Sequence, residues 1–279
     1  MKLSIITVNF NNAEGLNRTL CSIKNQTCLE LEHIIIDGGS SDDSIGIIEA
    51  YDARFESLRA KDCWDYPLIS WVSEKDEGIY DAMNKGVRKA KGDYLYFLNS
   101  GDMLASPTVV KEMISLLDGT DCVIGRVVLT RNGRVEGQTP LMSEKDMSLY
   151  HMYLHGINHQ SALIKRDILL NTPYDITVKI SADWKFFVQA IVLGAASTRF
   201  VDLSFANYDL SGISSDTQAI LRERESLLGA LLPERIVRDY LTIAPHYYEI
   251  IRVGWLLRHP FWYKIYRTLT SFGRIIWRS

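Results

Sequence analysis

The sequence lacks any long apolar run: no hydrophobic stretch approaches the roughly 20 residues that a membrane-spanning helix requires. The apolar stretch that follows Met1 and Lys2 is too short for a secretory signal peptide, and asparagines follow it at once. Cysteine is scarce and shows no spacing typical of a metal site, so we expect reduced thiols in a cytoplasmic protein. The four cysteines are Cys21, Cys28, Cys63 and Cys122.

A strong excess of charge of either sign is also missing. The chain has 31 Lys and Arg against 34 Asp and Glu, which gives a formal net charge of −3. Proteins that bind nucleic acid through bulk charge are strongly basic, so we expect no nucleic-acid partner. The chain has 279 residues, 47% of them hydrophobic. It can therefore form one large α/β domain, or one such domain with an appendage.

Short apolar runs alternate with helical spacing in the first part of the chain. Runs that predict strands occur at residues 3–8, 34–36, 69–72 and 94–98. Helical spacing lies between them, at residues 14–25, 44–51 and 79–89. This alternation is typical of βαβ units with right-handed crossovers. We therefore predict an α/β fold with a Rossmann-like, doubly wound, mostly parallel sheet.

The pattern loosens after residue 102. We predict helices at residues 107–117 and 182–193, strands at 122–125, 127–129, 161–164 and 198–203, and a hairpin turn at 131–134. The composition changes near Ser215, where charged helical segments begin. We therefore predict a main domain at residues 1–215 and a helical, basic and aromatic C-terminal extension at residues 216–279.

The last 35 residues, from Pro245, hold six Lys or Arg, one acid and many aromatic residues. A polar, mostly basic stripe consists of Lys264, Arg267, Ser271, Arg274 and Arg278. An apolar face consists of Phe261, Ile265, Leu269, Phe272 and Ile276. This pattern is typical of a helix that lies on anionic lipid, so residues 245–279 predict a peripheral attachment to the inner face of the cell membrane. The alternative is a helix that packs its apolar face on the domain and leaves its arginines in solvent.

Two predicted strands end in a turn that carries a carboxylate. The strand at 94–98 leads into Asn99-Ser100-Gly101-Asp102, and the strand at 34–36 leads into Asp37-Gly38-Gly39-Ser40. Ligands of α/β sheets bind beyond the C-terminal ends of the strands. A carboxylate there can hold Mg²⁺, which takes few protein ligands and completes its shell with water and phosphate oxygens. These strand ends predict a site for a phosphorylated ligand.

Three segments carry a closer resemblance. They are Ser4-Ile5-Ile6-Thr7-Val8-Asn9-Phe10-Asn11, Ile36-Asp37-Gly38-Gly39-Ser40-Ser41-Asp42 and Leu98-Asn99-Ser100-Gly101-Asp102. In order and spacing they resemble the signatures of family 2 glycosyltransferases, which have the GT-A fold, and the similarity spans about residues 1–215. Residues 77–86 together with residues 99–102 resemble the colanic-acid branch, which builds bacterial exopolysaccharide. The resemblance implies an inverting transfer from a nucleoside-diphosphate sugar to an acceptor hydroxyl, and we expect a lipid-linked saccharide as the acceptor.

The resemblance implies donor contacts from the first strand end and from the helix near residue 79. The expected donor-binding residues are Thr7, Asn9, Asn11, Asp37, Asp81, Asn84, Lys85, Asn99 and Gly101. Asp37 can accept hydrogen bonds from the base or the ribose, but the family often has two adjacent acids here and this chain has Gly38. The alternative is that Asp37 is a turn or helix-cap residue. For the helix, the alternative is an ordinary acidic first turn that complements the helix dipole.

The metal motif of most relatives reads Asp-x-Asp, and here Asn99 and Gly101 occupy those two positions. Asp102 follows them and is the expected ligand for a divalent metal, Mg²⁺ or Mn²⁺. The departure from the family pattern weakens the expectation of tight metal binding without a nucleotide.

The segment from Ile180 to Phe187 resembles the family's catalytic-base segment, so we expect Asp183 to be the general base. The alternative for Asp183 is a helix N-cap. Trp184 either stacks on an acceptor sugar or belongs to the core. Relatives carry His-Gln where this chain has His159 and Gln160, so we expect these residues to contact the acceptor or the diphosphate. Ser211-Gly212-Ile213-Ser214 resembles a loop that closes over the diphosphate, and the alternative is a plain linker.

Two other functions are compatible with the sequence. A nucleotidyltransferase also uses acids and a metal, but it typically has a Gly-rich loop with Arg or Lys after the first strand, which residues 9–14 do not provide. A nucleotide-sugar-binding protein that has lost catalysis would tolerate the missing acids at positions 99 and 101. The retained Asp102 and Asp183 favour an enzyme.

Overall fold

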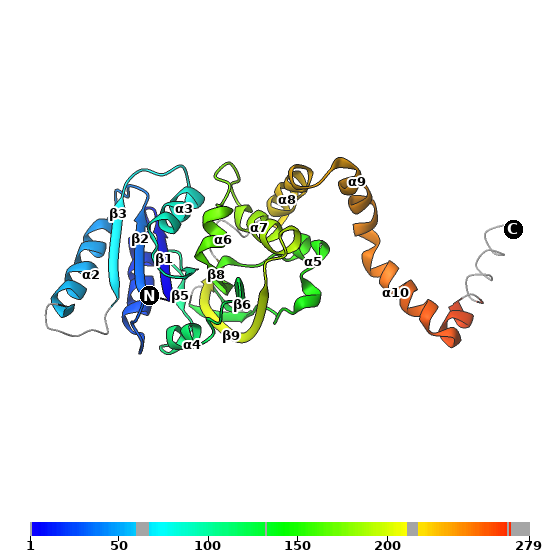
Figure 1. Cartoon of the computed structure of the whole chain (residues 1–279), viewed down its shortest axis with the longest axis horizontal. Coiled ribbons are helices and arrows are strands. Elements are labelled where there is room, and N and C mark those ends of the chain that lie inside the picture. Colours follow the sequence, from blue (N-terminus) through cyan, green and yellow to red (C-terminus); the bar gives the residue numbers. More distant parts are fainter. Residues whose placement is uncertain (1, 60–66, 132, 211–216, 267, 269–279) are drawn as a thin grey trace. The chain divides into compact units, whose positions relative to one another are not determined.

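The computed structural model describes residues 2–59, 67–131, 133–210, 217–266 and 268 (Figure 1). The chain divides into two compact units, and the division falls between Glu225 and Ser226. The domain boundary predicted after residue 215 lies outside the described residues, as do Cys63 and the loop Ser211-Gly212-Ile213-Ser214.

Four parallel strands form the first half of the sheet. They are β1 (Leu3–Asn9), β2 (Glu32–Asp37), β3 (Leu68–Ser73) and β4 (Tyr94–Phe97). Their order is β3-β2-β1-β4, and Asn9, Asp37 and Ser73 lie side by side in the register. Every residue of β1 and β2 is buried, as expected of strands that are covered on both faces. The strands predicted from the apolar runs are confirmed.

Three helices connect these strands and cover the two faces. They are α1 (Ala13–Lys24), α2 (Ser44–Arg59) and α3 (Ile79–Lys89). Helices α1 and α2 share a core with β2, in which Leu16 and Ile48 pack around Ile35. Helix α3 packs against β1, where a Cβ atom at Gly86 would lie only 2.4 Å from Cγ2 of Ile6. Glycine at this position therefore permits the close approach of α3 to the sheet.

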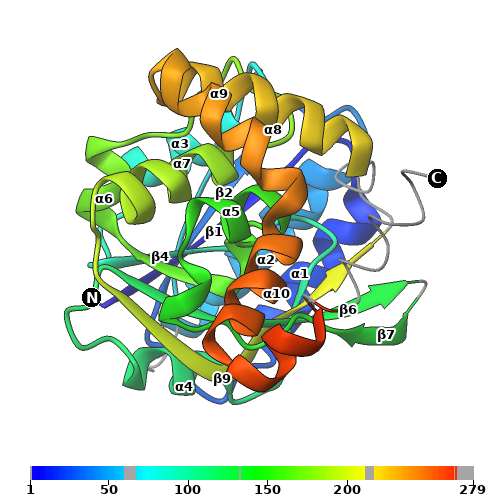
Figure 2. The same cartoon turned by 90° about the vertical axis from the view of Figure 1, so that its right-hand side faces the viewer.

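The second half of the sheet is mixed rather than mostly parallel. It contains β5 (Met103–Leu104), β6 (Cys122–Arg131), β7 (Arg134–Gln138), β8 (Ala162–Lys165) and β9 (Thr198–Asp209). The order continues β4-β8-β6-β9-β5, and β7 forms a hairpin with β6 (Figure 2). Strand β8 runs antiparallel to both of its neighbours, and β9 runs parallel to β6. The predicted α/β fold is confirmed, and the parallel arrangement holds for its first half.

Strand β6 joins two strands that the sequence pattern separated. Its pairing with β9 shifts register between Ile124 and Arg126. A Cβ atom at Gly125 would lie 2.6 Å from the backbone oxygen of Leu203, so the last residue of the first predicted strand must be small. Gly125 thus marks an irregularity inside one strand and not the end of a strand.

Short helices and turns connect the later strands. They are α4 (Val109–Ser115), a 3-10 turn (Glu144–Asp146), α5 (Leu149–Leu154), a second 3-10 turn (His159–Ser161), α6 (Arg166–Asn171) and α7 (Ala182–Phe187), which continues as a π-helical turn (Val188–Leu193). Because β8 is antiparallel to β4, the turn His159–Ser161 before β8 lies at the edge of the sheet where β4 ends. This places His159 beside the loop that carries Asn99 and Asp102.

The C-terminal part contains α8 (Thr217–Leu231), α9 (Glu234–Ile243), a 3-10 turn (Ala244–His246) and α10 (Tyr247–Arg258). Many large apolar side chains here are exposed, namely Ile236, Ile243, Ile250, Ile251, Val253, Trp255, Leu257, Phe261, Trp262 and Ile265. Most of the predicted basic stripe and apolar face, from Arg267 and Leu269 onward, lies outside the described residues. Among the described residues, no helix is both long enough and apolar enough to span a membrane.

Candidate active site

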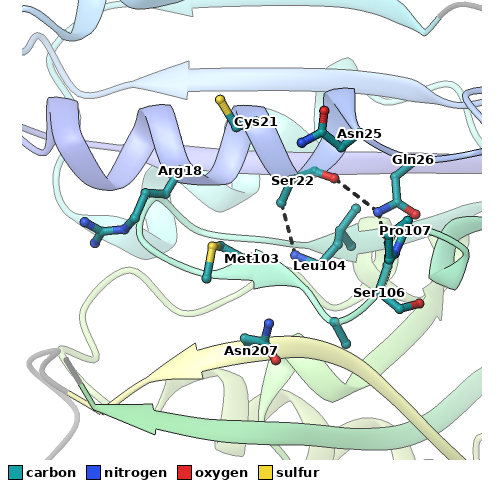
Figure 3. A pocket seen from close by; sticks show the side chains of 11 residues that line it. Arg18, Cys21, Ser22, Asn25, Gln26, Met103, Leu104, Ser106, Pro107 and Asn207 are labelled. Carbon is teal, nitrogen blue, oxygen red and sulfur yellow. Dashed lines mark hydrogen bonds between the residues drawn. The ribbon is translucent and has the colours of Figure 1, made fainter. Parts of the chain in front are cut away.

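A cavity of about 370 Å³ lies between α1 and the segment that follows Asp102 (Figure 3). Its lining includes Arg18, Ser22 and Met103. The hydroxyl oxygen of Ser22 accepts a hydrogen bond from the backbone N–H of Leu104 at 3.1 Å, which fixes α1 to β5. None of the acids that we expect to carry the chemistry lines this cavity. We therefore place the candidate active site in a different cluster, around Asp183.

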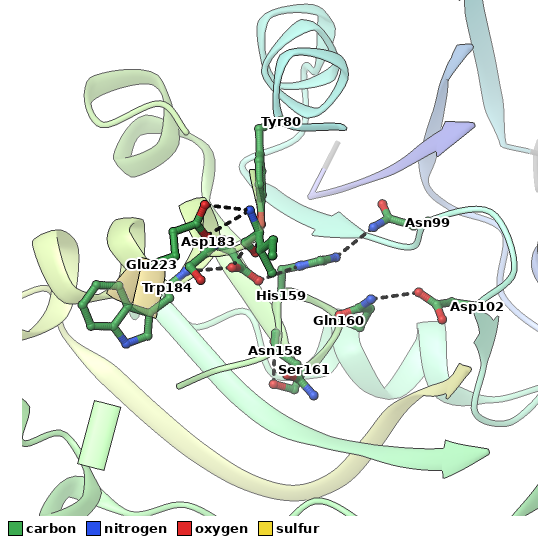
Figure 4. Close-up of polar contacts among 12 residues, drawn as sticks. Tyr80, Asn99, Asp102, Asn158, His159, Gln160, Ser161, Asp183, Trp184 and Glu223 are labelled. Carbon is green, nitrogen blue, oxygen red and sulfur yellow. Dashed lines mark hydrogen bonds and ion pairs between the residues drawn. The ribbon is translucent and has the colours of Figure 1, made fainter. Parts of the chain in front are cut away.

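The carboxylate of Asp183 lies in the middle of a chain of polar contacts (Figure 4). Asp183 is the second residue of α7, and its side chain is 18% exposed. Its Oδ2 lies 2.9 Å from Nδ1 of His159, and its Oδ1 accepts a hydrogen bond from the backbone N–H of Trp184 at 2.8 Å. The hydroxyl of Tyr80, on α3, lies 3.4 Å from Oδ1. Contacts at both oxygens hold the carboxylate in one orientation, as a general base requires.

His159 connects Asp183 to the loop after β4. Its Nε2 lies 2.9 Å from Nδ2 of Asn99, which donates the hydrogen bond. The ring proton then resides on Nδ1 and is donated to Asp183. Because Asn99 donates to Nε2, it sets the tautomer in which Nδ1 carries the proton that faces the carboxylate.

Asp102 is buried, with an exposure of 6%. Nε2 of Gln160 donates a hydrogen bond to its Oδ2 at 2.9 Å, and the backbone N–H of Asp209 approaches its Oδ1 at 3.3 Å. Burial raises the pKa of Asp102 to about 6, although the hydrogen bond from Gln160 opposes this rise. Ionisation of this carboxylate is costly in the free protein, and a nearby cation would stabilise the ionised form.

The consecutive residues His159 and Gln160 contact two residues of the same loop. His159 contacts Asn99, and Gln160 contacts Asp102. Because His159 also contacts Asp183, a single turn links the expected base to the expected metal ligand. Both residues were predicted to contact the acceptor or the diphosphate, and the structure gives each of them a partner within the site.

The loop after β4 owes its shape to Gly101 and to α1. Gly101 has φ +107°, a left-handed conformation that favours glycine. Its backbone N–H donates to Oγ1 of Thr19 at 3.0 Å, and that hydroxyl donates to the backbone oxygen of Asp102 at 2.7 Å. Gly101 therefore contributes to the site through the shape that its backbone gives to this loop.

The donors near this loop fit a divalent metal that is shared with a phosphorylated ligand. Oδ1 of Asn99 is buried and has no hydrogen-bond partner among the described residues. Like the carboxylate of Asp102, it is an oxygen donor of the kind that Mg²⁺ and Mn²⁺ prefer. The described part of the chain contains no group of three or more His, Cys, Asp or Glu that could hold a metal. The remaining ligands would therefore come from water and phosphate oxygens.

Asp37 holds together the ends of three strands. It is fully buried, and its carboxylate accepts hydrogen bonds from Asn9 of β1 at 2.8 Å and from Ser73 of β3 at 2.7 Å, as well as from the backbone N–H and hydroxyl of Ser40. Burial alone would raise the pKa of Asp37, but these hydrogen bonds outweigh it and lower the pKa below its ordinary value. These contacts make Asp37 a turn residue that joins the ends of three strands, and its contact with the base or the ribose stays a prediction.

Asn9 and Asn11 shape the loop after β1. Asn9 donates to Asp37, while its Oδ1 is buried without a partner among the described residues. Asn11 has φ +47°, and its Oδ1 accepts a hydrogen bond from the backbone N–H of Ser41 at 2.8 Å. Between them the ring of Phe10 is 62% exposed. This loop therefore presents the flat ring of Phe10, which suits contact with a nucleotide base.

Gly38 lies between Phe10 and Asp76. A Cβ atom at Gly38 would lie 2.5 Å from Oδ2 of Asp76 and 3.3 Å from the Phe10 ring. A glycine is needed here so that the two side chains can approach its backbone. Asp76 also shapes the turn before α3, because its Oδ1 accepts from the backbone N–H of Gly78 at 2.9 Å.

The predicted donor residue Thr7 lies in the interior of β1 and not in the loop. Its side chain is fully buried, and Oγ1 lies 3.0 Å from Nε2 of His33. Burial lowers the pKa of His33 to about 3, so this ring is neutral in the folded protein. The structure therefore corrects the expected position of Thr7, because its hydroxyl is hydrogen-bonded to His33 inside the sheet.

The three predicted donor residues of α3 hold neighbouring segments in place. Nζ of Lys85 lies 3.1 Å from Glu74 and 3.4 Å from Asp81, and it donates to the backbone oxygen of Lys75. These partners raise the pKa of Lys85, although burial opposes them. Asn84 is buried and makes two hydrogen bonds, of 2.8 and 3.0 Å, to the backbone of Tyr174. Lys85 and Asp81 thus support the loop before α3, and Asn84 joins α3 to the segment before α7.

Comparison with known proteins identifies the family of this chain. The model of the family described as Glycosyl transferase family 2 matches residues 4–185, well over half of the sequence. The chain belongs to glycosyl transferase family 2. The family assignment inferred from the three segments is confirmed, and so is the prediction of a glycosyltransferase over a nucleotidyltransferase.

Named relatives agree with this assignment. An uncharacterized glycosyltransferase of Mycobacterium tuberculosis is 30% identical over 236 residues, which are 82% of this chain and 81% of the relative. A PGL/p-HBAD biosynthesis glycosyltransferase of Mycobacterium bovis is 30% identical over 219 residues, which are 77% of this chain and 79% of the relative.

Solved structures share the fold of this glycosyltransferase. TarS of S. aureus, residues 1–349 with UDP, has a TM-score of 0.58 at 19% identity, and the match covers 85% of this chain and 68% of TarS 1–349. The mannosyltransferase PcManGT of Pyrobaculum calidifontis, with GDP-Man and Mn²⁺, has a TM-score of 0.55 at 13% identity and matches 97% of this chain and 83% of that protein. These similarities confirm the expected GT-A fold.

Trp184 belongs to the core of the glycosyltransferase. It is 1% exposed, and its Nε1 donates to the backbone oxygen of Met152. A ring without an accessible face does not stack on an acceptor sugar, so the predicted acceptor contact of Trp184 is wrong and the core alternative holds. The indole lies on the buried face of α7, together with Phe186 and Phe187.

Several residues of the glycosyltransferase site were not predicted from the sequence. Tyr80 contacts Asp183 from α3, Thr19 supports the loop after β4, and Glu223 contacts the backbone before Asp183 from α8. Tyr80 lies within residues 77–86, which carry part of the family resemblance, so the sequence did mark its segment. The other two lie in ordinary helical segments that carry no local sign of these contacts.

Proposed function

We propose that this family 2 glycosyltransferase transfers a sugar from a nucleoside-diphosphate sugar to an acceptor hydroxyl, with inversion at the anomeric carbon. The observation that carries the proposal is the pair His159–Gln160, which links Asp183 to Asn99 and Asp102. A base for the acceptor and a carboxylate for the diphosphate side are thus held in one rigid cluster. Direct displacement requires both groups in one site.

In the proposed mechanism Asp183 removes the proton of the acceptor hydroxyl. The oxygen forms a bond to the anomeric carbon while the bond from that carbon to the diphosphate breaks on the opposite face. The hydrogen bond from Nδ1–H of His159 keeps one carboxylate oxygen oriented, and the exposed part of Asp183 remains available to the hydroxyl. Asn99 holds the imidazole in the tautomer that this arrangement needs.

Asp102 and Oδ1 of Asn99 are the proposed metal ligands, for Mg²⁺ or Mn²⁺. A divalent metal bound there would neutralise charge on the leaving diphosphate. The presence of Mn²⁺ with GDP-Man in the structure of PcManGT supports this part of the proposal.

The proposed donor is a UDP or GDP sugar. The loop after β1, with Asn9, Phe10 and Asn11, and the neighbouring Gly38 and Asp76 form the proposed base site. TarS has been solved with UDP-GlcNAc and PcManGT with GDP-Man, which supports a nucleotide sugar without selecting the base. Asp37, Asp81, Asn84 and Lys85 would act mainly by holding the surrounding backbone, because their side chains already have partners.

The proposed acceptor is a lipid-linked saccharide in bacterial cell-surface polysaccharide synthesis, as in the colanic-acid and exopolysaccharide branch. The exposed apolar side chains of α9 and α10 and of residues 261–266 support contact with a lipid surface. A relative named for PGL/p-HBAD biosynthesis is consistent with this class of acceptor. The glycosyltransferase would then act at the inner face of the cell membrane through residues 245–279.

A thermal-shift panel tests the function. UDP, GDP and their sugars are added with and without Mn²⁺ or Mg²⁺, and we expect one diphosphate to raise the unfolding temperature more with metal than without it. The stabilising nucleotide sugar is then used to measure release of the nucleoside diphosphate. Absence of stabilisation by every nucleotide and of any turnover in the presence of membrane lipid would contradict the proposal.

A further inference from the structure

The backbone before Asp183 is held by a carboxylate from a distant part of the sequence. Glu223, on α8, accepts a hydrogen bond from the backbone N–H of Lys179 at 3.0 Å through Oε1 (Figure 4). Through Oε2 it accepts from the N–H groups of Ile180 at 3.1 Å and Ser181 at 2.7 Å. Ser181 is the N-cap residue of α7, and Asp183 follows two positions later. One side chain thus binds three consecutive amides next to the base.

These amides have no local partner that could replace Glu223. Ser181 makes no capping hydrogen bond with its side chain, and its hydroxyl is buried without a partner among the described residues. A cap within α7 would stabilise only that helix. A carboxylate that lies 42 positions later also fixes where α7 begins relative to α8. The contact is therefore suited to positioning the start of α7, where Asp183 lies.

The next residue of α8, Arg224, contacts Trp184, the residue that follows Asp183. Its guanidinium carbon lies 5.6 Å from the centre of the Trp184 ring, and Nη1 donates to the backbone oxygen of Tyr153 at 2.8 Å. Consecutive residues of α8 therefore hold the segments before and after Asp183. The hydroxyl of Tyr80, on α3, donates to the backbone oxygen of Ile180 and lies 3.4 Å from Oδ1 of Asp183, so two helices that are far apart in the sequence hold the segment that carries the base.

We propose that Glu223 is a positioning residue for the general base. It keeps residues 179–181 in place and so holds Asp183 at hydrogen-bond distance from His159 and from the acceptor hydroxyl. This inference rests on the proposed role of Asp183. Because misplacement of reacting groups by about 1 Å can cost roughly 100-fold in rate, loss of this contact should slow the chemical step and spare donor binding.

The first test observes His159 directly and requires no substrate. Protein labelled with ¹⁵N-histidine is compared for wild type, Glu223→Gln and the control Glu225→Gln, which removes the same charge from an exposed side chain of the same helix. The His159 signals are assigned by their loss in His159→Gln. We expect wild type and the control to show a ring protonated at Nδ1, and Glu223→Gln to shift toward a mixture of tautomers. Unchanged His159 signals in Glu223→Gln would overturn the proposal.

The second test separates positioning from folding. With the donor found by thermal shift, we expect Glu223→Gln to lower kcat by about 10- to 100-fold and to change the donor KM by less than about twofold. Glu223→Asp, which keeps the charge, should recover part of kcat. In an Asp183→Asn background the Glu223 substitution should cause no further loss, because the group that it positions is gone.

Three outcomes oppose the proposal. A kcat for Glu223→Gln close to that of wild type would overturn it, as would an equal loss in the Asp183→Asn background. Loss of donor-induced thermal stabilisation in both Glu223→Gln and Glu223→Asp would assign the residue to folding. If the wild-type protein turned over no donor, the proposed function would fail, and the histidine spectra would still decide whether Glu223 orients the Asp183 segment.

Discussion

The two acids at the centre of the site lie in different environments. Asp102 is 6% exposed, and burial raises its pKa to about 6. The side chain of Asp183 is 18% exposed and lies within reach of donors from His159, Trp184 and Tyr80. A buried carboxylate with few partners suits a ligand for a cation, and a partly exposed, oriented carboxylate suits a base.

Replacement of Asp183 should separate chemistry from binding. In Asp183→Asn we expect transfer to fall by about 100- to 10,000-fold, because an amide does not accept the acceptor proton. Thermal stabilisation by the donor and metal should persist. The control is Asp167→Asn, an exposed acid on α6. Equal turnover by Asp183→Asn and wild type would refute the assignment of the base.

Metal binding should depend on pH through Asp102. The pKa of the Asp102 carboxyl is about 6 in the folded protein without metal and has its ordinary value of 3.8 in the unfolded chain. Between these two pH values the carboxyl is mostly protonated in the folded protein and mostly ionised in the unfolded chain. The group therefore lowers the free energy of unfolding as the pH rises through this window. Metal requires the ionised form, so the affinity for Mn²⁺ with the nucleotide should weaken as the pH falls below about 6. Titration calorimetry at several pH values measures this, and a dependence that persists in Asp102→Asn would contradict it.

At the scale of elements, the approach of α3 to β1 positions residues that we predict to lie near the donor. On α3, Lys85 contacts the loop before the helix, and Asn84 contacts the backbone of Tyr174. The approach depends on Gly86, where a Cβ atom would lie 2.4 Å from Ile6. The spacing between a helix and a strand thereby determines where the donor-side residues lie.

Gly86→Ala should lower the free energy of unfolding by about 1 to 3 kcal/mol, because the added methyl group overpacks the contact with Ile6. The matched control is Gly229→Ala in α8, where a Cβ atom would meet nothing within 4 Å. There we expect no loss, and a gain of up to about 1 kcal/mol from helix propensity. Urea unfolding measures both variants. Equal stability of Gly86→Ala and wild type would show that α3 can shift without cost.

At the scale of the whole molecule, apolar surface is distributed unevenly along the chain. The strands of the first unit are largely buried, whereas the helices after Ser226 expose many large apolar side chains. Exposed apolar surface of this extent usually marks contact with a membrane or another protein. The basic residues of the last 35 positions favour an anionic lipid surface.

The full chain should therefore bind vesicles that contain phosphatidylglycerol more strongly than vesicles of phosphatidylcholine alone. Replacing Trp255 and Trp262, which are 45% and 49% exposed, by Glu should weaken binding by about tenfold or more. The control Val135→Glu changes an exposed apolar residue of β7 in the first unit. Vesicle flotation measures the bound fraction. Equal flotation of the Trp variant and wild type would refute membrane attachment through these helices.

The sequence by itself determined the order of the elements in the first half of the sheet and predicted where the site lies. Apolar runs and helical spacing are local, so they predicted β1 to β4 and the helices between them. The rule that ligands bind beyond the ends of parallel strands then predicted that Asp37 and Asp102 lie at one edge. Family motifs added Asp183 and the pair His159–Gln160. All of these inferences use residues that are close together in the chain or belong to a known pattern.

The tertiary structure decided what each polar side chain contacts. Thr7 and Trp184 turned out to be buried, and the carboxylate of Asp37 turned out to be used between three strands. The direction of β8 and the contact from Glu223 could not be predicted either. The physical reason is that a hydrogen-bond partner is selected by the packing of the whole sheet, which brings together residues dozens of positions apart. Local sequence patterns contain no information about those distances.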